Sequence, residues 1–178
     1  MAAPYPGDGR HTGSYYAASA NPAPERPPLR GEREAEICVL GAGYSGLSTA
    51  LHLAEKGHEV AVVEGARVGW GASGRNGGQI VNGLNASLQT IERRYGRDTA
   101  TFVASLVQEG GEIIRQRVAT YGIACDLKDG NVFAALTSAH LRELEARQEL
   151  WRSYGIDNQQ MLDRTALRAH VGSNLYAG

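Results

Sequence analysis

Three glycines and one acid have the spacing of a site for phosphates and a ribose. Gly41, Gly43 and Gly46 stand in the order G-x-G-x-x-G, and Glu64 follows 23 residues after the first of them. Glycines let a backbone turn approach a pyrophosphate, and the amino end of a following helix offers unpaired N–H groups to it. A carboxylate at this distance accepts hydrogen bonds from ribose hydroxyls. The pattern therefore predicts a site for an adenine dinucleotide.

The segments around these residues are those that such a site requires. Residues 37–40 and 60–63 are apolar runs typical of buried parallel strands. Between them, apolar residues recur with helical spacing from Leu47 onward, and Gly57 is placed to end that helix. The order of strand, glycine turn, helix, strand and acid favours a Rossmann-like α/β fold. A glycine-rich turn in another kind of α/β protein is the alternative, and it leaves Glu64 unexplained.

A second glycine-rich segment begins directly after the acid. Seven glycines fall between Gly65 and Gly83, and residues 65–79 are called the glycine arm below. So many glycines cost backbone entropy, and they are expected where backbone passes close to a ligand. Within the arm, Arg75 is a candidate for a phosphate contact, and Asn76 for a hydrogen bond to a ring system. A flexible surface loop with a solvated arginine is the alternative.

These two segments resemble the FAD-dependent D-amino-acid oxidase family, which includes glycine and sarcosine oxidases. The resemblance is carried by residues 41–46, 51–57, 63–64 and 71–79. Spacing alone leaves NAD and FAD open, because both place an adenosine ribose against the acid. The resemblance implies FAD, with the end of the glycine arm beside the flavin. The residues that it implies as flavin contacts are Ser73, Asn76, Gly77, Gly78 and Gln79.

Further segments resemble the subgroup of this family that oxidises γ-glutamylputrescine. They are residues 14–21, 69–82 and 109–115. This implies an FAD-dependent oxidoreductase that oxidises a CH–NH2 amine to an imine and aldehyde, with molecular oxygen as acceptor and hydrogen peroxide as product. One alternative is an oxidase or dehydrogenase for glycine, sarcosine or D-amino acids. Two others are an NAD(P)-dependent dehydrogenase and a non-catalytic dinucleotide-binding module.

The candidate site is a cofactor site, and no catalytic residue or metal ligand is assigned. The five histidines show no paired metal-ligand spacing. The candidate cofactor-binding residues are Gly41, Gly43, Tyr44, Ser45, Gly46, Glu64, Gly65, Ser73, Arg75, Asn76, Gly77, Gly78 and Gln79.

The composition bounds the partners and the compartment. The net charge is −1 and no apolar stretch has the length of a membrane span, so we expect neither nucleic acid nor membrane as a partner. Cys38 lies in the first strand and Cys125 among apolar residues, and we expect both to be buried thiols. Unpaired thiols and the lack of a secretion-signal pattern favour the cytoplasm.

The chain divides into a leader and a main body. All six prolines lie in residues 1–34, which are expected to be largely extended or disordered. Residues 14–20 can form a helical turn whose tyrosines dock on the main body. Residues 35–178 are expected to be the N-terminal part of an FAD-binding domain with the beginning of a substrate domain. Family members are much longer, so we expect an N-terminal fragment of a two-domain flavin oxidase fold.

Appended α+β segments are expected after the glycine arm. Helices are predicted over 85–95 and over 98–121, the second capped by Asp98 and interrupted by Gly110 and Gly111. Two strands, 123–127 and 131–136, are predicted around an Asp-Gly turn. A helix capped by Thr137 or Ser138 and a short last helix capped by Asp163 complete the prediction.

Overall fold

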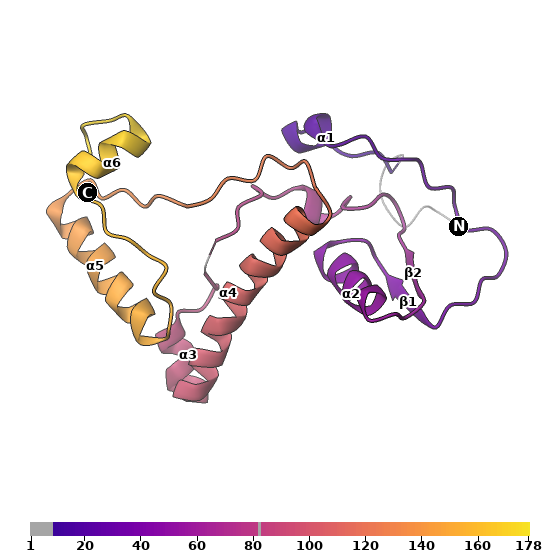
Figure 1. The fold of residues 1–178 in the computed structure, drawn as a ribbon, viewed down its shortest axis with the longest axis horizontal. Helices are drawn as coiled ribbons and strands as arrows, with labels where there is room; N and C mark the ends of the chain where they lie inside the picture. Colours follow the sequence, from indigo (N-terminus) through magenta and orange to yellow (C-terminus); the bar gives the residue numbers. More distant parts are fainter. Residues whose placement is uncertain (1–8, 82) are drawn as a thin grey trace. The chain divides into compact units, whose positions relative to one another are not determined.

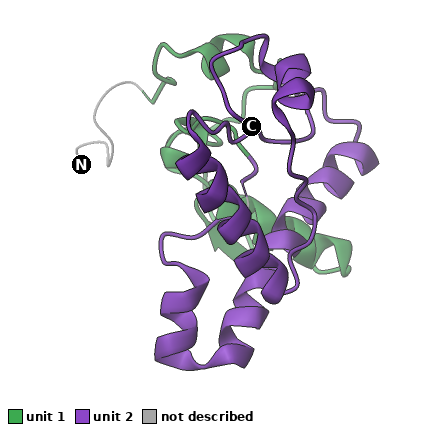
Figure 2. Cartoon of the chain, turned by 90° about the vertical axis from the view of Figure 1, so that its left-hand side faces the viewer, with its two compact units in different colours: residues 1–79 green, residues 80–178 purple. Residues whose placement is uncertain are grey.

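The computed structural model describes residues 9–81 and 83–178, and it divides the chain into two compact units (Figures 1 and 2). The first unit ends at Gln79 and the second begins at Ile80. Asn82, which falls within one segment of the family resemblance, lies outside the described residues. The division between the units thus lies well after residue 34, where the leader is expected to end.

The first unit is built on the predicted βαβ segment. Strand β1 (Ile37–Leu40) is followed by helix α2 (Tyr44–Glu55) and strand β2 (Val60–Val63). The strands pair in parallel, with Ile37 opposite Val60 and Leu40 opposite Val63. Gly57, at φ +89°, follows the last helical turn, and its N–H donates to the Ala54 carbonyl at 2.9 Å. Both strands, the helix and its glycine cap are therefore confirmed.

The expected burial of the two cysteines is wrong. Cys38 and Cys125 are both exposed. Along β1 the half-buried residues alternate with exposed ones, and Leu40 is 82% exposed. Helix α2 packs on the face of the sheet that carries Val39, so Cys38 and Leu40 point to the opposite, open face. Cys125 lies in a segment without regular structure.

The leader contains one short helix at the predicted place. Helix α1 (Tyr15–Ser19) is capped by Ser14, whose hydroxyl oxygen accepts a hydrogen bond from the Ala17 amide at 3.2 Å. The rest of residues 9–34 has no regular secondary structure. Residues 1–8 lie outside the described part of the chain.

In the second unit, helices α3 (Leu88–Tyr95) and α4 (Arg97–Thr120) form a hairpin about Gly96. The first of them begins later than predicted, at the hydroxyl cap of Ser87. Asp98 is not the cap of α4, which is a correction: Gly96, at φ +88°, ends one helix and precedes the next. Asp98 instead lies in the first turn, where its negative charge interacts favourably with the positive end of the helix dipole.

The two predicted strands over 123–127 and 131–136 are absent from the described residues. Both segments lack regular structure, and neither has a partner strand within the described part of the chain. Asp126 adopts φ +50°, which breaks the extended conformation of the first segment. Backbone hydrogen bonds at Ala135 go to Ala177 and Gly178 instead, each 2.7 Å long. The predicted hairpin at the Asp-Gly turn is therefore wrong.

The last two helices match their predictions. Thr137 caps α5 (Ser138–Ser153) and Asp163 caps α6 (Arg164–Val171), each through a side-chain oxygen that accepts a backbone N–H. Leu167 of α6 is 2% exposed. The main apolar cluster of the unit combines α3, α4 and the residues after α5. Its buried members are Leu88, Ala100, Ala104, Tyr154 and Ile156.

Candidate functional site

The turn between β1 and α2 requires glycine at two of its positions. Gly41 has φ +96°, a conformation that other residues rarely adopt. A Cβ on Gly46 would lie 2.0 Å from the Gly41 carbonyl oxygen, which no side chain can accommodate. The third glycine therefore allows the first turn of the helix to close against the strand end, as the spacing predicted.

The amino end of α2 has no side-chain cap of its own. Gly43 is the N-cap residue, and it supplies no side-chain hydrogen bond to the first helical amides. The first turn of a helix presents unpaired N–H groups and a partial positive charge. Ser45 and Gly46 lie in this first turn, so their backbone faces the place where a pyrophosphate would bind.

Glu64 lies at the carboxyl ends of both strands, beside the turn. Its two carboxylate oxygens accept hydrogen bonds from the Ala42 amide at 2.7 Å and from the Ala66 amide at 2.9 Å. These two backbone donors, the Ala42 amide first, lower the pKa of Glu64 below its usual value. The side chain is therefore a carboxylate at neutral pH, and it keeps lone pairs for further donors.

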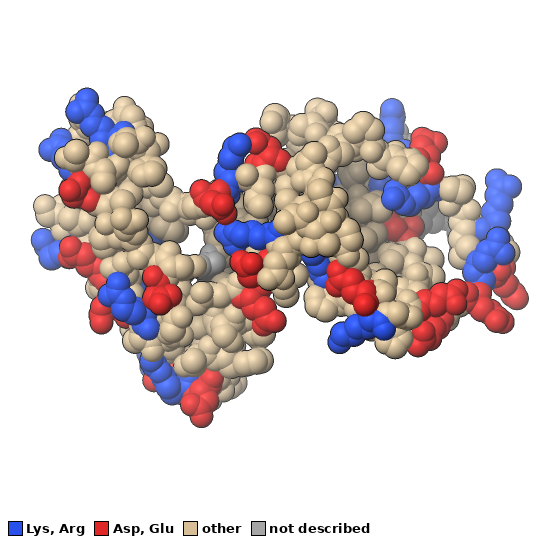
Figure 3. Space-filling view, in the orientation of Figure 1, with Lys and Arg blue, Asp and Glu red and all other residues tan. Residues whose placement is uncertain are grey.

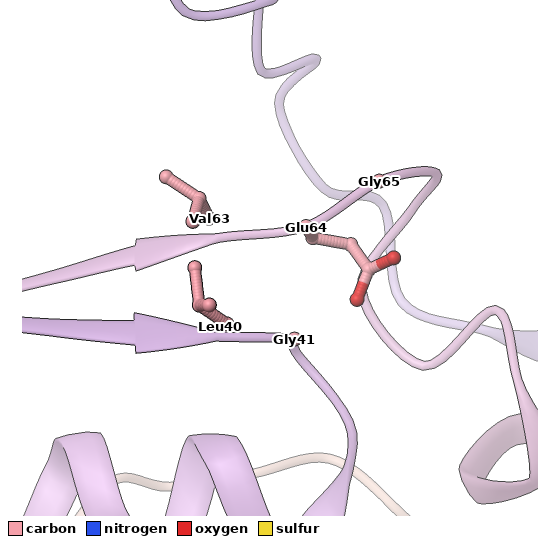
Figure 4. Close-up of a pocket in the computed structure, with 5 residues that line it drawn as sticks. All are labelled: Leu40, Gly41, Val63, Glu64 and Gly65. Carbon is pink, nitrogen blue, oxygen red and sulfur yellow. The ribbon is translucent and has the colours of Figure 1, made fainter. Parts of the chain in front are cut away.

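A cavity opens at this edge of the sheet. It has a volume of about 410 Å³, and Figure 4 shows the Glu64 carboxylate projecting beyond the two strand ends. In open α/β sheets, ligands bind at the carboxyl ends of the strands. The residues that line it are Leu40, Gly41, Val63, Glu64 and Gly65.

The glycine arm folds back onto the turn. The Gly69 amide donates to the Ala42 carbonyl at 2.9 Å, and the Tyr44 amide donates to the Ser73 hydroxyl oxygen at 3.0 Å. Ser73 lies in the short 3₁₀ helix η1 (Ala72–Gly74). A Cβ on Gly43 would stand 3.0 Å from the Ser73 hydroxyl oxygen, so the second glycine lets the arm approach closely. The arm is therefore joined to the turn by two hydrogen bonds and one close contact.

Asn76 connects the far end of the arm to the helix. Its side-chain amide donates to the Tyr44 hydroxyl at 3.1 Å and to the Ser73 carbonyl at 2.8 Å. Its carbonyl oxygen accepts the Gly78 amide at 2.8 Å. The side-chain carbonyl of Gln79 lies against Gly77, 3.0 Å from where a Cβ would stand. The structure thus brings together the turn, the acid and the polar groups of the arm.

Arg75 lies within the arm rather than over the turn. Its Nε donates to the Trp70 carbonyl at 3.0 Å, and its guanidinium carbon is 4.6 Å from the centre of the Trp70 ring. Its predicted phosphate contact stays a prediction. Sequence reasoning missed the Ala42 and Ala66 amides, because backbone donors leave no signal in residue type. It also missed Trp70, which holds the arginine in place.

Two observations show that this arrangement fits a dinucleotide. The backbone at Gly41 has open space where a side chain would stand, so phosphates can approach the turn. The Glu64 carboxylate stands at the strand ends and lines the cavity, where ribose hydroxyls would be its donors. Among the described residues, no group of three or more histidine, cysteine or acidic side chains is placed to hold a metal ion.

A second cavity, of about 460 Å³, lies in the other unit beside α5. Arg147 stands over the Phe133 ring there, with its guanidinium carbon 4.3 Å from the ring centre. None of the candidate site residues lines this cavity.

In the part of the chain that is described, no helix is both long enough and apolar enough to cross a bilayer.

A known protein family matches nearly all of the chain after the leader. The DAO family model, described as FAD dependent oxidoreductase, matches residues 36–178. That range holds the turn, the acid, the arm and all helices from α2 to α6.

Three curated relatives match almost the entire chain. The γ-glutamylputrescine oxidoreductase of Escherichia coli K12 is 48% identical over 168 residues, which is 94% of this chain and 39% of that protein. The probable oxidoreductase OrdL of Haemophilus influenzae is 43% identical over 94% of this chain and 39% of its own length. The probable oxidoreductase OrdL of Rhizobium meliloti is 27% identical over 92% of this chain and 38% of its own length. The chain thus spans about two fifths of the length of these relatives.

Proposed function

The chain belongs to the DAO family of FAD-dependent oxidoreductases, and from this premise we propose that its protein oxidises an amine, with γ-glutamylputrescine as the substrate. The CH–NH2 group is oxidised to an imine, water hydrolyses the imine to an aldehyde and ammonia, and molecular oxygen is reduced to hydrogen peroxide. The substrate rests on 48% identity to the Escherichia coli γ-glutamylputrescine oxidoreductase. The cofactor of the family is FAD.

The observation that carries the proposal is the geometry of the turn and the acid. Gly41 leaves the backbone before α2 open to a pyrophosphate, and an ionised Glu64 stands at the strand ends. We assign Tyr44 and Ser45, with the glycines of the turn, to the pyrophosphate. Glu64 and Gly65 are assigned to the adenosine ribose.

The glycine arm is assigned to the flavin side of the cofactor. In this proposal its close contact with the turn keeps both on one surface, so that a single extended molecule can lie along them. When bound, FAD supplies the two-electron acceptor for the C–H bond next to the amine nitrogen. The chain's own residues bind and orient it. The residues assigned to the flavin side are Ser73, Arg75, Asn76, Gly77, Gly78 and Gln79.

We further propose that residues 35–178 are the N-terminal part of an FAD-binding domain with the beginning of a substrate domain. The support is that the family model begins at residue 36 and that the relatives extend well beyond the matched part. In this proposal the complete protein has the two-domain fold of a flavin oxidase.

A peroxide-coupled assay tests the proposal. The protein purified from its own gene is offered γ-glutamylputrescine, putrescine, glycine, sarcosine and D-alanine in parallel, and hydrogen peroxide is measured. We expect γ-glutamylputrescine to have the highest kcat/KM, with putrescine much poorer because it lacks the γ-glutamyl group. Turnover of D-alanine or sarcosine without turnover of γ-glutamylputrescine would reject the substrate in favour of an amino-acid oxidase.

A further inference from the structure

The leader meets the glycine arm at two points in the first unit. The Tyr16 hydroxyl donates to the Gly77 carbonyl at 2.7 Å. The indole N–H of Trp70 donates to the Arg10 carbonyl at 3.0 Å. These contacts join residues separated by 61 and 60 positions in the chain. The leader is therefore attached near both ends of the segment 70–77.

The contact at Tyr16 holds the peptides of Gly77 and Gly78. Gly78 has φ +67°, and a Cβ there would lie 3.5 Å from the Tyr16 hydroxyl oxygen and 3.7 Å from two ring carbons. The ring therefore covers Gly78 while its hydroxyl binds Gly77. On the other side, the Asn76 side chain accepts the Gly78 amide. The two glycines are held between a tyrosine of the leader and an asparagine of the arm.

Helix α1 cannot keep this place by its own stability. It has five residues and none of them is buried. A helix of this length is unstable in isolation, because nucleation costs more than its few hydrogen bonds return. Its hydroxyl cap at Ser14 helps to form the turn but does not fix it in space. Contacts to the arm, such as that of Tyr16, are what place it.

We propose that Tyr16 is a positioning residue for FAD, and that the leader holds the end of the glycine arm in its cofactor-binding conformation. This rests on the proposed function, in which the arm runs beside the flavin. Two adjacent glycines have wide conformational freedom, and fixing them costs entropy when the ligand binds. The Tyr16 hydroxyl limits that freedom before FAD arrives. Tyr16 thereby acts on the cofactor through the backbone of Gly77 and Gly78.

The test uses the protein purified from its own gene and two tyrosines that are neighbours. Tyr16→Phe keeps the ring and removes the hydroxyl, while Tyr15→Phe is the matched control on a side chain that is 79% exposed. The FAD dissociation constant is measured from the fluorescence of free flavin. We expect it to rise about three- to tenfold for Tyr16→Phe, the effect of one hydrogen bond. Tyr15→Phe should bind FAD like the wild type.

A second readout reports on the arm itself. Trypsin cleaves after Arg75 in the arm, and the exposed Arg142 of α5 is the control site. We expect faster cleavage after Arg75 in Tyr16→Phe, with the rate at Arg142 unchanged. Tyr16→Ala, which also removes the ring over Gly78, should show a larger effect on both readouts.

The outcomes separate the leader contact from the proposed function. Unchanged FAD binding in Tyr16→Phe overturns the proposal, and so does equal weakening in both Phe variants. Faster cleavage with unchanged FAD binding means that the leader holds an arm that does not serve the cofactor. If the wild type binds no FAD, both proposals fall, and the cleavage pattern still reports whether the contact exists.

Discussion

Glu64 accepts two backbone N–H groups while it stands at the ligand-facing edge of the sheet. Because both donors bind the ionised form, the same hydrogen bonds that lower its pKa also fix the direction of the carboxylate. A pre-oriented anion can then accept from ribose hydroxyls without first losing side-chain freedom. Glu64 therefore links the glycine turn to the start of the arm, and in the proposed function it also binds the nucleotide.

The lowered pKa of Glu64 predicts a pH-dependent contribution to stability. Because the pKa of Glu64 is lower in the folded state, its ionised carboxylate stabilises the fold at pH values above the unfolded-state pKa of about 4.3. This stabilisation is lost as the pH falls through the folded-state pKa. We expect wild type to exceed Glu64→Gln in urea midpoint at pH 7, with the difference shrinking toward pH 3. Glu145→Gln, on exposed helix surface, is the control. A difference that stays constant across this range would contradict the assignment.

Gly46 sets the shape of the turn by the absence of a single carbon atom. In Gly46→Ala the new Cβ would meet the Gly41 carbonyl oxygen at 2.0 Å, so the helix start or the strand end must move. We expect a loss of about 2–4 kcal/mol in the free energy of unfolding, with loss of FAD binding. Gly13→Ala, which has open space around it, should be near neutral. Thermal unfolding and flavin fluorescence measure the two effects, and wild-type behaviour of Gly46→Ala would refute the role.

At the scale of elements, α4 carries a pair of glycines in different surroundings. A Cβ on Gly110 would meet open space, whereas one on Gly111 would lie 3.3 Å from Ile80 Cγ2. Gly110→Ala should therefore raise the free energy of unfolding by about 1 kcal/mol, the usual gain in helix propensity. Gly111→Ala should gain less, because the tight contact with Ile80 offsets it. Thermal unfolding of the two variants measures these changes in stability. A larger stabilisation by Gly111→Ala than by Gly110→Ala would contradict the tight contact with Ile80.

Tyr154 connects the end of α5 to the α3–α4 hairpin. It is 3% exposed, its hydroxyl donates to the Glu92 carboxylate, and the Arg97 guanidinium carbon lies 4.0 Å from its ring centre. This hydroxyl is the main cause of the lowered pKa of Glu92, and Glu92 in turn raises the pKa of Tyr154.

The Tyr154–Glu92 contact should stabilise the second unit across the neutral range. It requires an ionised Glu92 and a protonated Tyr154, so its contribution is lost as the pH falls through the folded pKa of Glu92. We expect Tyr154→Phe to lower Tm by about 2–4 °C at pH 7 and by less near pH 3. Tyr95→Phe, on an exposed ring, is the control. Equal Tm values for Tyr154→Phe and wild type at pH 7 would show that this contact does not stabilise the unit.

The same scale explains which elements could be predicted. The βαβ segment and the capped helices follow local rules, since apolar spacing and cap residues act within a few positions. A strand depends on a partner that local sequence does not contain. Residues 123–136 have strand composition and a turn signal, yet they have no neighbouring strand among the described residues and form irregular chain. The exposure of Cys38 has a similar cause, because burial depends on what covers each face of the sheet.

For the molecule as a whole, the candidate site belongs to the first unit alone. Its thirteen predicted residues lie between Gly41 and Gln79, and the glycine spacing was sufficient to find the turn and the acid. The docking of a leader tyrosine is predictable from the sequence, and Tyr16 confirms it. The partner atoms that join arm, turn and leader are not predictable, because most of these contacts use backbone groups. Basic and acidic side chains are interspersed on the face drawn in Figure 3, in keeping with the net charge of −1.

The central claim, that the Gly41–Gly46 turn and Glu64 form an FAD site, is tested most directly by flavin content. FAD bound per chain is measured after denaturation, for wild type and Glu64→Gln, with NAD offered as a competitor. We expect stoichiometric FAD with a flavin absorption spectrum, no displacement of FAD by NAD, and an affinity for FAD weakened about tenfold or more in Glu64→Gln. A colourless wild-type protein that binds NAD instead would contradict it.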